Sequence, residues 1–261
     1  MSANITTNQI LKNAVKCLKA SNQYITLPTT VFNPLPSDVF SISMWFYCTA
    51  LDSTNQRLYL VGNMNASQKG FDLLYYTPNN SLFIQFEVSN GGNTNGMNFK
   101  IGNQTSMLNK WHHVVFTKNG LSNATWNMYL DGVLLAGVSS TNTLLSGDTV
   151  QTGVPVQINA TGNAASFIAD SYFSNYQFYN RALTATEALG LYRFPMITVS
   201  GLTANYKFSE HNGQTIVDSV SANNGSLISF TSGSTATPPA LQSGNTTWYE
   251  YLSVPNNPII I

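Results

Sequence analysis

The sequence predicts an all-β fold in which two antiparallel sheets pack into a sandwich. Apolar residues alternate with polar ones along many short stretches, and clusters of Gly, Asn, Pro and Asp separate these stretches at intervals typical of a sandwich or barrel. The 261 residues are 43% hydrophobic, which is enough to fill a large core. We therefore expect one large β domain with little helix.

The start of the chain leaves two alternatives open. The apolar spacing in residues 10–18 fits an amphipathic helix. Residues 15–27 fit a pair of strands around a Ser-Asn-Gln turn equally well. Periodicity alone does not decide between helix and strands.

The strands that follow have clearer patterns. Residues 40–48 alternate with a period of two and carry apolar side chains on both faces, with Trp45 and Tyr47 on the second face. A strand that is apolar on both faces is expected in the centre of a sheet. Residues 82–88 and 111–117 have similar strand patterns.

Two local signals predict a hairpin and one short helix. Asp131-Gly132 lies between two apolar runs and tolerates the positive φ angles of a type I′ turn, which favours a hairpin. Thr184 and Glu187 have the spacing of a capping box before a run of good helix formers. The helix is expected to end near Tyr192, before the next proline.

The last part of the chain differs in composition. Residues 231–244 are rich in Ser, Gly, Thr and Pro and are interpreted as a linker or draped loop. Residues 258–261 are Pro-Ile-Ile-Ile, an apolar end that we expect to dock on a protein surface.

Five sequence motifs follow one another over roughly residues 14–194. They are Leu18-Lys-Ala-Ser-Asn-Gln-Tyr-Ile-Thr-Leu-Pro28, Phe40-Ser-Ile-Ser-Met-Trp-Phe46, Trp111-His-His-Val-Val115, Met128-Tyr-Leu-Asp-Gly-Val133 and Phe173-Ser-Asn-Tyr-Gln-Phe-Tyr-Asn-Arg-Ala-Leu-Thr-Ala-Thr-Glu-Ala-Leu-Gly-Leu-Tyr192. In this order they resemble the laminin-G-like, concanavalin A-like lectin/glucanase family of jelly-roll domains. The resemblance implies a two-sheet antiparallel jelly-roll sandwich, but this fold hosts lectins, glycosidases, receptor modules and structural proteins.

A further stretch, residues 201–227, resembles the segment that usually precedes such a domain, although here it follows. Too few residues remain for a second domain, so it either folds back on the sandwich, which we favour, or adds to a neighbouring subunit. The expected organisation is a sandwich in residues 1–195, the returning segment in 196–230, and a linker with a docking C-terminal tail in 231–261.

The charge content excludes several partners. Charged residues make up 8% of the chain, with 11 basic and 11 acidic residues, where about 25% is usual. This balance gives no electrostatic footprint for nucleic acid or anionic membranes. The polar side chains of the surface are instead expected to come from the 31 Asn, 27 Ser and 27 Thr residues. The near-zero net charge suits close packing in a multi-protein assembly.

The sequence also bears on location. The first seven residues lack the basic and apolar regions of a secretory signal, and no apolar run approaches the roughly 20 residues of a membrane span. We expect a protein of a virion, or of the extracellular space or cell surface, without a signal peptide in this chain. Cys17 and Cys48 match no zinc pattern and are expected to be buried free thiols.

Carboxylates suited to glycosidase chemistry are not found. A retaining glycosidase needs two carboxylates about 5–5.5 Å apart, and related glucanases place them on one strand. The chain has only four glutamates, and no two of them have that spacing: Glu87, Glu187, Glu210 and Glu250.

The histidines also favour no catalytic role. His112 and His113 are adjacent in a predicted strand, so they face opposite sides and cannot form one site. We expect one of them to be structural and the other to face solvent. His211 is expected in an exposed loop.

Calcium is the ion that the resemblance implies. In this family it is held by oxygen ligands from loops at the sandwich edge. The candidate ligands are Asp170, Glu210 and Asp218, and no two of them lie close in sequence. We expect no cofactor, with calcium as the open possibility.

Glycan binding needs aromatic platforms beside amide and hydroxyl groups. The best candidate cluster combines Asp72, Tyr75 and Tyr76 with a Gly- and Asn-rich loop. Since adjacent strand residues face opposite sides, at most one of the two tyrosines can be a platform. The loop contributes Asn90, Asn93 and Asn95.

These observations favour a protein that is not an enzyme. The first hypothesis is a structural or interaction subunit of a particle or surface assembly, for example a viral capsid or virion-surface protein, whose partners are other protein subunits. The alternative is a carbohydrate-binding lectin module, assisted or not by calcium.

Overall fold

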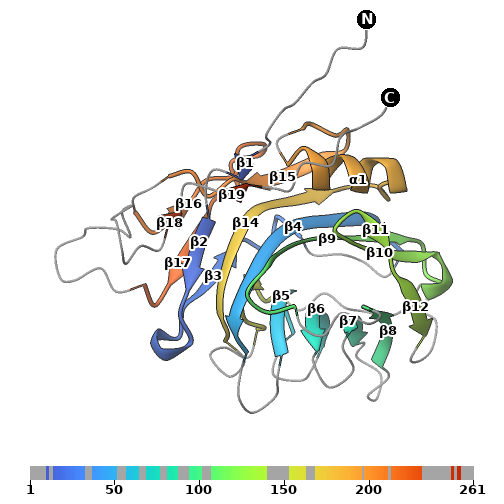
Figure 1. The fold of residues 1–261 in the computed structure, drawn as a ribbon, viewed down its shortest axis with the longest axis horizontal. Coiled ribbons are helices and arrows are strands. Elements are labelled where there is room, and N and C mark those ends of the chain that lie inside the picture. Colours follow the sequence, from blue (N-terminus) through green and yellow to red (C-terminus); the bar gives the residue numbers. More distant parts are fainter. Residues whose placement is uncertain are drawn as a thin grey trace, which may run out of the picture.

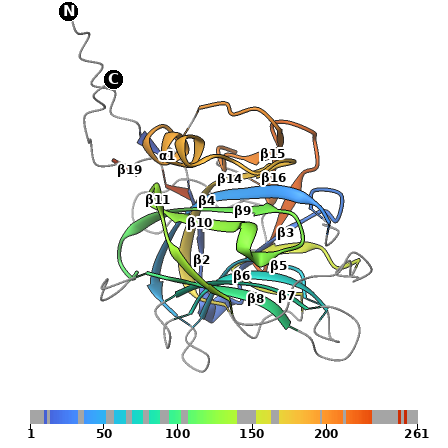
Figure 2. The same cartoon turned by 90° about the vertical axis from the view of Figure 1, so that its right-hand side faces the viewer.

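In the computed structural model, most of the described residues form two antiparallel sheets that pack as a sandwich (Figure 1). The first sheet curves over the second, and helix α1 (Ala185–Arg193) lies on the outer side of the first sheet (Figures 1 and 2). The described residues are 10–11, 14–32, 37–51, 57–64, 69–76, 81–87, 94–101, 107–139, 153–162, 168–195, 197–210, 213–230, 248–249 and 252–253.

The first sheet has eight strands, and β4 is central in it, as its two apolar faces predicted. β4 pairs with β9 on one side and with β14 on the other. In spatial order the strands are β11 (Val133–Leu134), β10 (Trp126–Leu130), β9 (Trp111–Asn119), β4 (Val39–Ala50), β14 (Asp170–Tyr179), β2 (Ala14–Cys17) and β18 (Trp248–Tyr249), with β15 (Leu202–Tyr206) also paired to β14.

The second sheet has nine strands. In spatial order they are β12 (Ala136–Ser139), β8 (Thr94–Lys100), β7 (Ser81–Glu87), β6 (Gly70–Tyr76), β5 (Arg57–Gly62), β13 (Val156–Ile158), β3 (Tyr24–Leu27), β17 (Gly225–Ile228) and β16 (Thr215–Ile216). Two short 3₁₀ helices, η1 (Lys19–Ser21) and η3 (Asn123–Thr125), connect strands.

The core lies between the sheets and follows the period of two. On β4, Phe40, Ile42, Met44 and Phe46 belong to one buried cluster with residues of the second sheet such as Leu60. The jelly-roll sandwich with one short helix is therefore confirmed for the described residues.

The start of the chain forms strands, not a helix. β2 and β3 flank η1, and Asn22 ends η1 in the left-handed region with φ 52°. The two strands do not pair with each other, because β2 joins the first sheet beside β14 and β3 joins the second beside β13. The turn at residues 19–23 therefore carries the chain from one sheet to the other.

The predicted hairpin is confirmed between β10 and β11. Asp131 and Gly132 have φ angles of 52° and 78°, as a type I′ turn requires. The positive φ at Gly132 favours glycine there, and a Cβ atom would also lie 2.7 Å from Leu189 Cδ1 of α1, so that side chain would have to shift.

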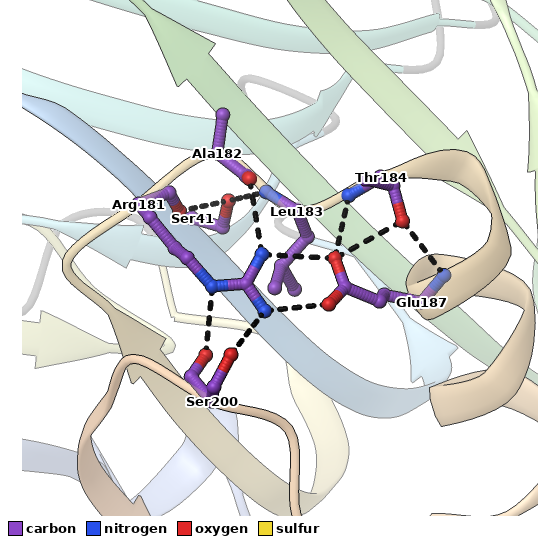
Figure 3. Close-up of polar contacts among 7 residues, drawn as sticks. All are labelled: Ser41, Arg181, Ala182, Leu183, Thr184, Glu187 and Ser200. Atoms are coloured by element: carbon purple, nitrogen blue, oxygen red, sulfur yellow. Dashed lines mark hydrogen bonds and ion pairs between the residues drawn. The ribbon is translucent and has the colours of Figure 1, made fainter.

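The predicted helix is confirmed, with Thr184 and Glu187 forming the full capping box. Arg181 fixes this helix start to its surroundings (Figure 3). Its guanidinium donates two hydrogen bonds to Glu187, of 2.9 and 2.6 Å, and others to Ser200. Ser41 of β4 accepts from Leu183 N and donates to Arg181 O, which ties the helix start to the first sheet.

Residues 202–228 contribute to both sheets. β15 pairs with β14 in the first sheet, while β17 pairs with β3 in the second. The turn between them is organised by Asp218, which accepts hydrogen bonds from the backbone N–H groups of Asn205, Val220 and Ser221. The boundaries of the expected segments, 1–195, 196–230 and 231–261, stay a prediction.

Two pieces of the C-terminal segment pair with the start of the chain. Trp248 and Tyr249 pair with Val15 and Ala14, and β19 (Leu252–Ser253) pairs with β1 (Ile10–Leu11). The predicted linker at 231–244 and the apolar end at 258–261 lie outside the described residues.

Cys17 and Cys48 are buried free thiols, as predicted. Cys17 and Cys48 pair with Ser171 of β14 from opposite sides. Their Cα atoms are therefore about two strand spacings, ~10 Å, apart, which exceeds the ~7 Å Cα–Cα limit of a disulfide. Burial raises the pKa of Cys17, and it raises that of Cys48 to about 12.

Candidate functional site

The predicted glycan cluster on β6 is mostly buried. Tyr75 belongs to the core and Asp72, on the opposite face, is 1% exposed and accepts a 2.6 Å hydrogen bond from Thr161. The carboxylate of Asp72 thus lies away from solvent, and its role as a sugar ligand stays a prediction. Tyr76 is partly exposed, which confirms that at most one of the two tyrosines can be a platform. The guanidinium carbon of Arg57 lies 5.1 Å from the centroid of the Tyr76 ring.

The structure also separates Tyr76 from Asn95 of the predicted loop, whereas Asp72 pairs with Gln85, the partner of Gly96. Tyr76 pairs with Ser81 at one end of β7, whereas Asn95 pairs with Phe86 near the other. Five strand positions span about 17 Å, so Tyr76 and Asn95 lie toward opposite ends of the strands. Asn90 and Asn93 lie outside the described residues.

The predicted calcium ligands are engaged in backbone contacts and do not converge. Asp170 accepts a hydrogen bond from Lys19 N, and Glu210 accepts one from Val217 N. Asp218 lies near Glu210. Asp218 bridges to Tyr206, and Tyr206 pairs with Tyr176 of β14. Asp170 lies six residues before Tyr176 on β14, so it is distant from the other two candidates. No cluster of three His, Cys, Asp or Glu side chains is found in the part of the chain that the structure describes. Calcium binding stays a prediction.

The two adjacent histidines face opposite sides, as predicted, but both are buried. His112 Nδ1 lies 2.8 Å from Asp131 Oδ2, and His113 Nε2 lies 2.9 Å from Ser43 Oγ. The prediction that one histidine faces solvent is wrong, because Tyr192 of α1 covers the outer side of His113. Burial lowers the pKa of His113 to about 3, so its ring is neutral at physiological pH.

The glutamates are not assembled into a described catalytic pair. Glu187 is held by Arg181, which lowers its pKa to about 2. Glu210 orders the turn before Asp218. Glu87 is described only by its backbone in β7, and Glu250 and His211 lie outside the described residues.

Sequence reasoning missed a group of aromatic rings on the outer face of the first sheet. Tyr47, Trp111 and Tyr172, here called the aromatic triad, are all partly exposed. Their ring centroids form a triangle with sides of 5.7 Å (Tyr47–Trp111), 5.6 Å (Tyr47–Tyr172) and 6.5 Å (Trp111–Tyr172). Lys16 Nζ lies 5.6 Å from the centroid of Tyr172.

Strand register brings these residues together. Trp111 pairs with Tyr47, Tyr47 pairs with Tyr172, and Tyr172 pairs with Lys16, across the adjacent strands β9, β4, β14 and β2. The neighbouring residues Phe46 and Phe173 are in the core, so the triad faces outward. The alternation in residues 40–48 already showed that Tyr47 lies away from the core, but it could not show which residues flank it.

The triad is bounded on one side by α1. Trp45, on the same face of β4 as Tyr47, is buried beneath Tyr192, with ring centroids 5.6 Å apart and an interplanar angle of 20°. Trp111 packs against the same group. The arrangement thus presents three apolar ring surfaces and one ammonium group to solvent, beside the stacked rings of Trp45 and Tyr192.

Comparison with known families identifies the class of this domain. Residues 19–188 match a laminin-G-type family described as the concanavalin A-like lectin/glucanases superfamily. The match covers well over half of the chain, so the chain belongs to this superfamily. No curated protein matches it in sequence.

Solved structures share the fold at low sequence identity. A proposed carbohydrate binding protein from Bacteroides ovatus ATCC 8483 has 16% identity and a TM-score of 0.55, covering 84% of this chain and 58% of that one. A heptameric SAP-like pentraxin from Limulus polyphemus has 12% identity and a TM-score of 0.51, covering 84% and 94%. This chain thus spans less than two thirds of the Bacteroides protein, and these likenesses show the fold alone.

No helix in the described residues has the length and apolar character needed to cross a membrane.

Proposed function

We propose that this protein is a carbohydrate-binding module that contacts its ligand through the aromatic triad. The observation that carries the proposal is three partly exposed rings gathered on one face of a lectin-type sandwich. The superfamily and the Bacteroides protein's description as a carbohydrate binder support the same ligand class.

Aromatic rings suit sugars for a physical reason. The C–H faces of a sugar ring are apolar and pack on aromatic faces, while its hydroxyls need hydrogen-bonding partners at the edge. Lys16 supplies such a donor beside Tyr172. A surface rich in Asn, Ser and Thr and poor in charge is compatible with a neutral, hydroxyl-rich ligand.

The proposed role is binding without catalysis. His113 is neutral, buried and covered by Tyr192, and Glu187 serves the helix start. Neither group is placed to transfer a proton to a ligand on the triad. Incubating the protein with any glycan that it binds should therefore leave the glycan uncleaved.

A glycan array tests this function. The full chain is applied once with calcium and once with chelator, and Trp111→Ala and Tyr76→Ala are compared with it. We expect selective binding that Trp111→Ala weakens by roughly tenfold or more while Tyr76→Ala, on the outer face of the other sheet, keeps it. Loss of binding in Tyr76→Ala alone would move the site to β6, and no binding in either condition would reject the function.

A second role as an interaction subunit of an assembly, such as a virion or surface layer, is favoured by one observation. Val133 and Leu134 are 65% and 55% exposed on β11, which ends the first sheet. Exposed apolar residues on an edge strand favour association with another chain. Light scattering should show association of the full chain with rising concentration and none for Val133→Lys/Leu134→Glu; a monomer at all concentrations would reject this role.

A further inference from the structure

The rings of the aromatic triad converge over one point of the sheet. Trp111 and Tyr172 belong to β9 and β14, which flank β4, so their backbones lie about two strand spacings, ~10 Å, apart. Their ring centroids are only 6.5 Å apart. The Trp111 and Tyr172 rings therefore approach each other, and the Tyr47 ring lies to one side of them, 5.7 and 5.6 Å away, so the three rings form a compact triangle and not a row across the sheet.

The rings also differ in orientation. The interplanar angle is 55° between Tyr47 and Trp111, 90° between Tyr47 and Tyr172, and 56° between Trp111 and Tyr172. No two of these rings share a plane, so they cannot stack on successive sugars of a flat, extended chain. They can contact one sugar ring by a face and its neighbour by an edge.

Surrounding groups limit the surface further. Along the strands, Trp45 is two residues from Tyr47, about 7 Å away, and the ring of Tyr192 stacks over it. Across the strands, Lys16 of β2 lies beside Tyr172 of β14. The contact area is therefore compact, with an aromatic wall on one side and a cationic group on another.

We infer that the aromatic triad recognises a short saccharide, one or two sugar units at the end of a glycan, and not a stretch inside an extended polysaccharide. This inference rests on the proposed carbohydrate-binding function. The triad supplies apolar contact to the terminal units, and the Lys16 ammonium donates a hydrogen bond to a sugar oxygen at the rim. Further units of a longer chain would extend beyond the three rings.

The test compares ligand length. A glycan array that displays each terminal mono- or disaccharide on carriers of several lengths is followed by calorimetry with the mono-, di-, tetra- and hexasaccharide of the strongest hit. We expect hits to share their terminal units, and affinity to change by no more than about twofold between the di- and hexasaccharide, because added units gain no contacts. Affinity that rises tenfold or more over that range, or hits that need internal sequences, would overturn the inference and leave the proposed function standing. No hit of any length would reject the function itself.

Two variants link the length preference to the triad. Tyr172→Ala removes one ring, and Lys16→Met removes the ammonium while it keeps the aliphatic stem and leaves the core untouched. We expect both to lower the affinity for the di- and hexasaccharide by the same factor. A larger loss for the hexasaccharide would show that these residues contact units beyond the second and would contradict the inference. Unchanged thermal unfolding of Lys16→Met would confirm that the loss is not one of folding.

Discussion

At the scale of single residues, His113 is the group whose titration should matter most for folding. It is buried between Trp45, Tyr192 and Ser43, and burial lowers its pKa to about 3 from an ordinary value near 6.5. The unfolded chain binds a proton at this histidine below pH 6.5, whereas the folded chain does so only near pH 3. Stability is therefore fully present above pH 6.5 and is lost as the pH falls toward 3.

The expected loss between pH 6.5 and 5 is about 2 kcal/mol in the free energy of unfolding. Urea denaturation at a series of pH values measures it. His113→Asn serves as the control, because it removes the titrating ring, and its stability should change less with pH across this window. An equal slope in the variant would show that another group causes the acid sensitivity.

Both histidines illustrate what sequence can and cannot show at this scale. Adjacent positions on a strand fix opposite faces, and His112 and His113 do contact different partners, Asp131 and Ser43. Exposure cannot be derived in this way, because it depends on what covers each face. Helix α1 begins 72 residues later in the chain, at Ala185, and its Tyr192 covers His113.

At the scale of elements, the start of α1 depends on Glu187. Its carboxylate accepts from Thr184 N and from Arg181, and Glu187 N donates to Thr184 Oγ1. Glu187→Ala should lower the free energy of unfolding by about 1–2 kcal/mol, mostly from the lost cap, since the ion pair is partly exposed and contributes little. Thr186→Ala, an exposed change in the same helix, should cost less than about 0.5 kcal/mol. Equal losses for the two variants in urea denaturation would contradict this role of Glu187.

The elements themselves were largely predictable, whereas their neighbours were not. The period of two, the Asp131-Gly132 turn and the Thr184 capping box act within a few residues, and each predicted its element correctly. The aromatic triad depends on the register of β9, β4 and β14, strands that are far apart in the chain. The distance between Tyr76 and Asn95 could not be derived from the sequence for the same reason, because it depends on how β6, β7 and β8 pair.

At the scale of the whole molecule, residues 202–228 close one edge of the sandwich. β15 and β17 add a strand to each sheet, and Tyr206 of β15 donates a hydrogen bond to Asn223 O in the turn before β17. Beyond them, β18 and β19 pair antiparallel with β2 and β1 in one register, since Trp248, Tyr249, Leu252 and Ser253 pair in order with Val15, Ala14, Leu11 and Ile10. These four strands are therefore expected to pair within one molecule.

A cross-link tests this pairing. Ala14 and Tyr249 are directly opposite, and antiparallel partners have Cα atoms about 4.5–5.5 Å apart, within disulfide reach. Ala14→Cys/Tyr249→Cys should form an intrachain disulfide on mild oxidation, run as a monomer on a non-reducing gel, and gain about 2–4 kcal/mol of stability. Ala136→Cys/Tyr249→Cys is the control, because Ala136 is exposed on β12 in the other sheet and should not cross-link. A covalent dimer of the first variant would contradict pairing within one chain, because the strand beside β2 would then come from a neighbouring copy.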